Sequence, residues 1–311
     1  MRFHRECVKT ADKFSFHGLV HRAGALFDEE AFISSGENAI VDFKYSPSPR
    51  ITWWFDHHQS AFLTPEDQKK FEQGQADGSQ RMRMFFNPNY ISCTSLIADK
   101  AQVNFGFNTA PMLELIKWAD IVDGARYESA KAAVEMAAPA MKLTMVIESA
   151  DDNNLVQRLI PLLTEMSLQE VLEQDFVQKL LGPLMERHWA GLELIRQRAT
   201  VDRGVVTFDI TDQPTEGYNK FIPYYLHPDA TYNVGLSKSS FRTKVSVGTN
   251  PWTKLPASQL VNLAASCERY GGGGHARVGA ISFPPNHEDE ARKAVGEIVA
   301  ELRAASPNPR K

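Results

Sequence analysis

The sequence predicts an α/β protein of two domains, in which an N-terminal domain with a parallel sheet is joined by a helical linker to a smaller α/β C-terminal domain. Three features predict this fold class. Short apolar runs that end in polar residues come first, helical periodicity dominates the middle, and β-rich segments separated by turn residues return after residue 204. A length of 311 residues also exceeds one ordinary core.

Three short apolar stretches predict the parallel strands of the first domain. They cover residues 14–16, 39–41 and 51–55, and the polar side chains that follow them are His17, Asp42 and Asp56. The ligand crevice of an open α/β sheet lies at the carboxyl ends of its strands. We therefore expect these side chains to converge on one site, together with the two histidines that follow Asp56.

Helices are predicted between about residues 90 and 198. One helix is indicated by apolar residues at helical spacing, namely Leu113, Ile116, Trp118 and Ile121. A capping box, Ser167 with Glu170, starts another helix. A longer helix is predicted over residues 177–198, either as a bridge to the second domain or as an ordinary core helix.

The second domain is predicted from β-rich stretches at residues 205–210, 232–236 and 244–247, which are separated by Gly, Pro and Asn turn signals. We expect the first domain at residues 1–185, the helical linker at 186–200 and the second domain at 201–311.

The composition limits the classes of partner. A net charge of −4 provides no global basic field for gripping long nucleic acid, which favours a small phosphorylated substrate or a short single-stranded oligonucleotide. Three cysteines without a CxxC pair predict neither a disulfide framework nor a zinc site. No apolar run approaches the roughly 18–20 residues of a membrane span, so we expect a cytoplasmic protein and no membrane contact. The sequence leaves the oligomeric state open, and a homodimer is compatible with it.

The string Asp56-His57-His58, together with separate aspartates, predicts a metal site. Mg²⁺ and Mn²⁺ prefer carboxylate oxygens, and Mn²⁺ tolerates imidazole better, so a mixed set of Asp42, His57 and a further aspartate suits these ions. Asp120 and Asp123 share one helix face, and Asp123 is favoured because Gly124 indicates the helix end. A single aspartate at a strand end is more often only a turn former.

Two such ions, roughly 3.5–4 Å apart, lower the pKa of a bridging water and hold phosphoryl oxygens for in-line attack. His58 would then contact the phosphate or assist proton transfer, and Asp56 would support the histidines, so both are placed in the catalytic set.

Four successive glycines before His275 predict a loop whose amides and imidazole face an anion, with Arg242 and Lys244 as nearby positive charges. The alternative is a flexible turn. Four glycines in a row cost backbone entropy, which favours a requirement for close approach. The expected substrate-binding residues are Gly272, Gly273, Gly274, His275 and Arg242.

These motifs resemble the DHH phosphoesterase superfamily, in the branch whose DHH domain is joined to a DHH-associated domain with a GGGH signature. The resemblance covers nearly the whole chain. It implies hydrolysis of phosphodiester or phosphoanhydride bonds with two Mn²⁺ or Mg²⁺ ions. It also implies that Asp42 bridges the ions, that His57 and Asp123 are further ligands, and that His58 faces the substrate. The GGGH segment would bind the phosphate or base end of the substrate.

One motif departs from that family. Its first motif, His-x3-Asp-x-Asp, would start at His17, but His21 and Ala23 stand where the two aspartates belong. Histidine can coordinate a metal and alanine cannot, so His17 and His21 are the expected contributors, with Asp28 or Glu29 as substitutes in a rearranged loop.

The sequence thus favours a metal-dependent phosphoesterase acting on short oligonucleotides, nucleotides or related small phosphorylated molecules. Two alternatives remain. One is a non-catalytic relative that binds a nucleotide or phosphate at a degenerate metal site, and the other is an exopolyphosphatase.

Overall fold

The computed structural model describes residues 1–11, 13–19, 36–150, 153–213, 215 and 217–306. The chain divides into two compact units, each described here by itself. Unit 1 comprises Met1–Tyr127 and Ala137–Leu181, and unit 2 comprises Glu128–Met136 and Gly182–Lys311. Each unit combines helices with its own sheet, so the predicted α/β fold class is confirmed.

In the described part of unit 1, the sheet has three parallel strands in the order β1 (Ala39–Val41), β2 (Trp53–Asp56) and β3 (Met84–Phe86). Ile40 lies opposite Trp54, and Phe55 lies opposite Phe85. The strands expected at residues 39–41 and 51–55 are therefore confirmed. The third strand is one that the sequence pattern did not indicate, because three apolar residues after an arginine are too short a run to distinguish from a loop.

The strand expected at residues 14–16 is wrong. These residues form no strand, and the backbone oxygen of Phe16 accepts a hydrogen bond from the side chain of Gln157 on a helix. A three-residue apolar run has little strand preference of its own, so tertiary contacts decide its conformation.

Unit 1 also contains six α-helices and two short helical turns among its described residues. The helices are α2 (Pro65–Ala76), α3 (Cys93–Phe105), α4 (Leu113–Asp123), α6 (Pro139–Glu148), α7 (Asn153–Glu165) and α8 (Leu168–Leu172), and the turns are η1 (His4–Val8) and η2 (Ala110–Met112). The predicted capping box of Ser167 and Glu170 starts α8, and Thr64 with Asp67 forms a second box before α2.

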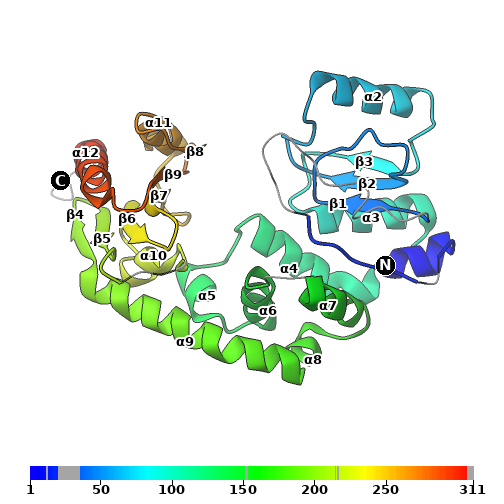
Figure 1. Cartoon of the computed structure of the whole chain (residues 1–311), viewed down its shortest axis with the longest axis horizontal. Coiled ribbons are helices and arrows are strands. Elements are labelled where there is room, and N and C mark those ends of the chain that lie inside the picture. Colours follow the sequence, from blue (N-terminus) through cyan, green and yellow to red (C-terminus); the bar gives the residue numbers. More distant parts are fainter. Residues whose placement is uncertain (12, 20–35, 151–152, 214, 216, 307–311) are drawn as a thin grey trace. The chain divides into compact units, whose positions relative to one another are not determined.

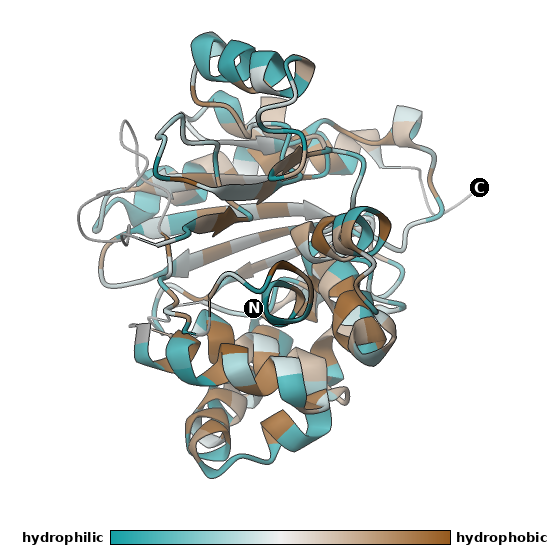
Figure 2. Cartoon of the chain, turned by 90° about the vertical axis from the view of Figure 1, so that its right-hand side faces the viewer, coloured by the Kyte–Doolittle hydropathy of each residue, from teal (hydrophilic) through white to brown (hydrophobic). Residues whose placement is uncertain are grey.

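Helices cover both faces of the three-stranded sheet (Figure 1). On one face Trp54 packs with Phe71 of α2, and on the other Trp53 and Phe55 pack with Leu96 of α3. All four residues of β2 are buried, which is the pattern of a parallel strand covered on both sides. In Figure 2 the strands carry hydrophobic residues, whereas α2 at the top is mostly hydrophilic.

The sheet of unit 2 has six strands in the order β4-β5-β6-β7-β9-β8. Their bounds are β4 (Thr200–Asp202), β5 (Val205–Asp209), β6 (Tyr232–Lys238), β7 (Thr243–Thr249), β8 (Gly273–His275) and β9 (Val278–Phe283). Only β5 and β6 are paired in parallel; the other pairs are antiparallel. All three β-rich stretches expected after residue 204 are confirmed.

Two layers of helices enclose this sheet (Figure 1). One face is covered by α11 (Leu263–Glu268) and α12 (Glu288–Ala305), whose apolar residues share a core with Val234 and Val245. The other face, over β5, is covered by α5 (Ala130–Glu135), α9 (Asp175–Arg198) and α10 (Ile222–Leu226). A 3-10 turn, η3, spans Ala257–Gln259.

The long helix expected over residues 177–198 is confirmed as α9, which begins in unit 1 and continues in unit 2. Ile195 on this helix is fully buried. Among the described residues, no helix combines the length and the apolar character that crossing a membrane requires.

Candidate metal and substrate sites

Polar side chains gather at the carboxyl ends of β1 and β2, as the strand pattern predicts. Asp42 follows β1 directly, and Asp56, His57 and His58 stand where β2 ends. One donor atom from each of Asp42, His57 and His58 lies within 4.8 Å of the others. His57 Nε2 is 3.3 Å from Asp42 Oδ1 and 3.1 Å from Asp123 Oδ2. Residues that are up to 81 positions apart in the sequence thus form one cluster.

Asp42 has an unusual backbone conformation. Its φ of 57° lies in the left-handed region, which costs a non-glycine residue energy but is tolerated best by Asp and Asn. Its amide still donates to Phe55 O over 2.9 Å. The chain therefore turns sharply out of the sheet just after its last ladder contact, and the half-exposed carboxylate lies beside His57.

Asp56 holds the two histidines in place. It is only 1% exposed, and its Oδ1 accepts hydrogen bonds from the amides of His57 (2.8 Å) and His58 (3.1 Å) and from His58 Nδ1 (2.7 Å). A carboxylate can only accept, so Nδ1 of His58 carries the proton of the bond to Asp56. This bond to a buried carboxylate fixes the orientation of the His58 ring. Asp56 acts here as a positioning residue.

His57 is arranged as a ligand. Its Nδ1 lies 3.1 Å from the backbone oxygen of Tyr90, a contact that places the proton on Nδ1 and the lone pair on Nε2. His57 Nε2 is buried and has no hydrogen-bond partner among the described residues, although two carboxylates lie beside it. A lone pair and two carboxylates are all acceptors, so a cation between them would satisfy each one.

The charges of the cluster also suit a cation. Burial raises the pKa of Asp123, and the negative charge of Asp42 raises it further, while His57 and His58 oppose this shift. Burial alone would lower the pKa of His58, but Asp56, Asp42 and Asp123 together outweigh it and raise that pKa. The excess of negative charge would be balanced by Mn²⁺ or Mg²⁺, and the oxygen and nitrogen donors present fit those ions.

Asp123 and Asp120 have different surroundings although both lie on α4. Asp123 is the last residue of the helix and lies beside His57. Asp120 Oδ1 accepts a hydrogen bond of 2.6 Å from Ser92, the residue that caps α3. Gly124 is required next to Asp123 because a Cβ there would come within 2.6 Å of Ile91.

The predicted ligands from the first motif do not join the cluster in the described part of the chain. His17 is exposed and is absent from the group formed by Asp42, His57 and His58. His21, like Ala23 and the substitutes Asp28 and Glu29, lies outside the described residues.

The loop expected at the four glycines is wrong in part, because its last residues form the edge strand β8. Gly273 lies opposite Ala280 and His275 opposite Val278. The cause is steric. A Cβ on Gly272 would lie 2.3 Å from Ala280 O, and one on Gly274 would lie 2.2 Å from Val278 O. These glycines therefore allow β8 to approach β9 closely. From the sequence alone, a glycine needed for strand packing looks the same as a glycine needed for ligand binding.

Gly273 differs from its neighbours. Gly271 has a φ of 72° and Gly274 one of 151°, whereas Gly273 has no positive φ, and a Cβ there would meet nothing described within 4 Å. Neither backbone conformation nor crowding within the described fold requires glycine at residue 273. Close approach of a bound molecule would require it.

The sheet face beside Gly273 carries small residues and positive charge. Ala280 lies opposite both Gly273 and Ser246, and these three residues form one row across the sheet. Lys244 lies on the same face, two residues before Ser246. Burial lowers the pKa of Lys244, and the charges of Arg242 and Lys220 lower it further. Such a cluster of like charges would be relieved by an anion.

Arg242 stands just before β7 and contacts the same face. Its Nη1 donates to Ser282 Oγ over 3.3 Å, and its guanidinium lies 5.0 Å from the centre of the Phe241 ring. The structure thus brings Arg242 and Lys244 to one end of this face, and His275 ends the exposed edge strand.

Tyr90 is a site residue that the sequence pattern missed. It contributes a backbone oxygen to His57, and a carbonyl is present at every residue, so no side-chain pattern identifies it. Only the pairing of β2 with β3 brings the segment after β3 under His57.

Comparison with known proteins shows likeness in fold. No protein-family model matches the chain, and no curated protein sequence matches it. The chain is similar to the solved structure of the pGpG-specific phosphodiesterase PggH from Vibrio cholerae, with 20% identity, a TM-score of 0.62 and coverage of 84% of this chain and 83% of that one.

Two further structures match with lower scores. An exopolyphosphatase-related protein from Bacteroides fragilis has 15% identity and a TM-score of 0.43, over 88% of this chain and 75% of its own. The DHH domain of a member of the S1p family of ribosomal proteins has 16% identity and a TM-score of 0.46, over 80% of this chain and 63% of its own.

Proposed function

From its DHH phosphoesterase superfamily fold, we propose that this chain is a hydrolase that cleaves phosphodiester or phosphomonoester bonds with Mn²⁺ or Mg²⁺. Its substrates would be short oligonucleotides, nucleotides or related small phosphorylated molecules. One observation carries the proposal: His57 Nε2 is buried without a hydrogen-bond partner among the described residues, between the carboxylates of Asp42 and Asp123.

The residues of the cluster would have different roles in the reaction. Asp42, His57 and Asp123 would hold the metal, which when bound lowers the pKa of a coordinated water and holds phosphoryl oxygens for in-line attack. Asp56 keeps both histidines oriented. His58 is 44% exposed, and its raised pKa favours the protonated ring, which can donate to a phosphate oxygen or to a leaving group.

Unit 2 would bind the substrate. Gly273 allows close approach, while Arg242, Lys244 and His275 supply donors for a phosphate. This proposal extends to the whole predicted set of Gly272, Gly273, Gly274, His275 and Arg242, in which Gly272 and Gly274 act by positioning β8.

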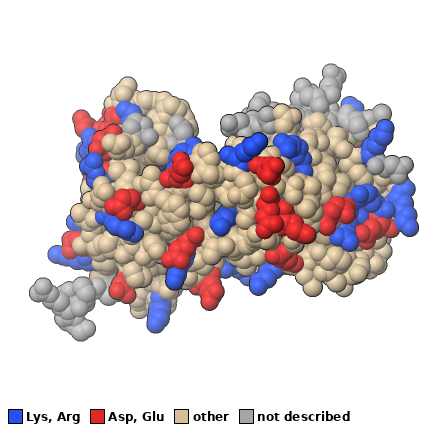
Figure 3. Space-filling view, turned by 90° about the horizontal axis from the view of Figure 1, so that it is seen from below, with Lys and Arg blue, Asp and Glu red and all other residues tan. Residues whose placement is uncertain are grey.

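Hydrolysis of long polyphosphate is the less favoured alternative. On the face shown in Figure 3, basic and acidic side chains are interspersed. A long polyanion would be better held by a continuous basic channel. The mixed charges of this face favour small substrates for the proposed phosphoesterase.

The proposal is tested by a panel of dinucleotides, cyclic dinucleotides, 3'-phosphoadenosine phosphate and short polyphosphate with Mn²⁺. His57→Ala should reduce turnover of the accepted substrate at least 100-fold, since it removes a ligand with little loss of core volume. His287→Ala removes a histidine from unit 2 at the start of α12, and it should retain full turnover.

Wild-type protein that binds a nucleotide but cleaves none of the panel would favour the non-catalytic relative. Turnover that survives in His57→Ala would contradict the metal assignment.

A further inference from the structure

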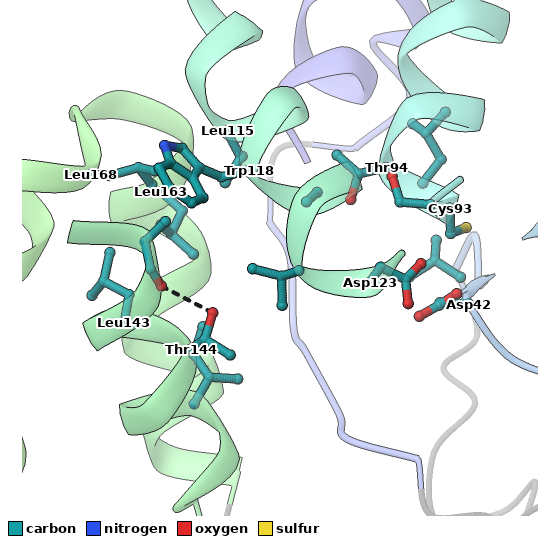
Figure 4. Close-up of a pocket in the computed structure, with 17 residues that line it drawn as sticks. Asp42, Cys93, Thr94, Leu115, Trp118, Asp123, Leu143, Thr144, Leu163 and Leu168 are labelled. Carbon is teal, nitrogen blue, oxygen red and sulfur yellow. Dashed lines mark hydrogen bonds between the residues drawn. The ribbon is translucent and has the colours of Figure 1, made fainter. Parts of the chain in front are cut away.

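A cavity of about 450 Å³ extends from the carboxylates of unit 1 between several helices (Figure 4). Helix α4 turns one face toward it, at positions i, i+3, i+4, i+7 and i+8, and the residues concerned are Leu115, Trp118, Ala119, Val122 and Asp123. Although most residues of α4 are apolar, none is fully buried. An apolar helix face that remains partly uncovered is a feature of a binding site.

The remaining walls are also mainly apolar. Leu143 and Ile147 of α6, Leu163 of α7 and Leu168 of α8 line the cavity. Leu143 and Leu168 are each only 3% exposed, so these walls belong to the packed helical part of unit 1. Figure 4 shows the leucines gathered with Trp118, while Asp42 and Asp123 lie together in another part of the view.

Two of the three hydroxyl side chains among the described residues on the walls are already engaged in hydrogen bonds. Thr144 donates to Ala140 O over 2.9 Å, the dashed line in Figure 4, and Ser92 donates to Asp120 over 2.6 Å. No Lys, Arg or His is among the described residues that line the cavity. A second phosphate or a polyphosphate chain placed there would lose its hydration without gaining a cation.

The cavity suits one ring system next to the carboxylates. Trp118 precedes Asp123 by five residues on α4, which corresponds to about 7.5 Å along the helix axis at about 1.5 Å per residue. Because Trp118 lines the cavity, a flat ring bound there can contact the indole ring, and aromatic pairs gain energy beyond simple area burial.

We propose that this cavity binds the aromatic organic group of a phosphate ester whose phosphoryl group lies at Asp42 and Asp123. The assignment rests on the proposed phosphoesterase function and narrows its substrates to esters with a flat, mainly apolar ring beside the phosphate. A nucleobase belongs to this class, and inorganic polyphosphate does not.

The test compares the binding of phenyl phosphate and methyl phosphate by calorimetry in the presence of Mn²⁺. At about pH 8 both esters are dianions, since the second pKa of a phosphate ester is about 6. Wild-type protein should bind phenyl phosphate about 10- to 100-fold more tightly, the range expected for burying one aromatic side chain. Ala119→Phe fills the cavity and should remove this preference, whereas Lys117→Phe, on the exposed side of α4, should retain it.

Equal affinity for the two esters in the wild-type protein, or binding of neither, would overturn the cavity assignment even if Ala119→Phe does not fold. Turnover is measured separately on the substrate panel. A phenyl preference without any turnover would refute the phosphoesterase and support the cavity, while turnover without the preference would do the reverse.

Discussion

The Glu37 side chain connects the N-terminal segment of unit 1 to strand β2 through hydrogen bonds. Its carboxylate accepts hydrogen bonds from His4 (2.8 Å), Thr10 (2.8 Å), Trp53 (3.2 Å) and Arg83 (2.9 Å). Burial alone would raise the pKa of Glu37, but these four bonds outweigh burial and lower it to about 2. The N-terminal segment is thereby tied to β2, whose carboxyl end carries the histidines.

Glu37→Gln should lower stability at neutral pH and should change its acid dependence. Because the pKa is lower in the folded state, the carboxylate's contribution is complete above about pH 4.5 and is lost as the pH falls toward about 2. Urea midpoints measured across this window should fall less steeply in Glu37→Gln than in the wild-type protein. The exposed Glu186→Gln on α9 is the control, and identical slopes in all three proteins would contradict the role of Glu37.

The glycines at and before strand β8 meet different steric demands in the described fold. Glycine is required at positions 272 and 274 where the chain packs against β9, because a Cβ at either position would lie within 2.3 Å of a backbone oxygen. Gly273, between them, is not demanded by the described fold. Neighbouring glycines therefore differ: Gly272 and Gly274 are required by the fold, and Gly273 is left for the proposed binding role.

Gly274→Ala is expected to affect stability, and Gly273→Ala is expected to affect substrate binding. Gly274→Ala should destabilise the protein by about 1–3 kcal/mol, because it combines a φ of 151° with a backbone clash. Gly273→Ala should leave stability within about 1 kcal/mol of wild type and should raise KM for the accepted substrate. Urea denaturation and steady-state kinetics measure the two effects. An unchanged KM in Gly273→Ala would remove this residue from the binding site.

In the whole chain, the two units carry their charges differently around their candidate sites. In unit 1, the neighbouring negative charges of Asp42 and Asp123 favour a cation. In unit 2, the neighbouring positive charges of Arg242 and Lys244 favour an anion. Each unit has its own core, so either site can be altered without removing the core of the other. Metal binding at the cluster of unit 1 would therefore be measurable as a stability effect of that unit.

Mn²⁺ should stabilise the wild-type protein by about 2.7 kcal/mol at a hundredfold excess over its Kd. In thermal unfolding this corresponds to a rise of roughly 5–10 °C for a unit of this size, reversed by a chelator. His57→Ala should lose most of the rise and His287→Ala should keep it. An equal rise in all three proteins would show that Mn²⁺ binds elsewhere.

Sequence patterns alone were sufficient where the signal is local. The capping box of Ser167 and Glu170, the helix α4, the strands β1 and β2, and the convergence of Asp42 with His57 and His58 all follow from periodicity and from the geometry of parallel strands. The helix end at Gly124 is also a local signal, and it favours Asp123 over Asp120.

Tertiary structure decided what depends on partners distant in sequence. Residues 14–16 form no strand, and the backbone oxygen of Phe16 accepts a hydrogen bond from the side chain of Gln157. The end of the glycine run forms an edge strand, because β9 lies too close to leave room for a Cβ. The contact of Tyr90 O with His57 and the apolar cavity along α4 arise only when separate helices and strands pack. The sequence by itself determined the fold class and the donor types of the Asp and His cluster, since both follow from residue types at short sequence spacing. Packing alone determined which side chains are left without partners, because that depends on every neighbouring element at once.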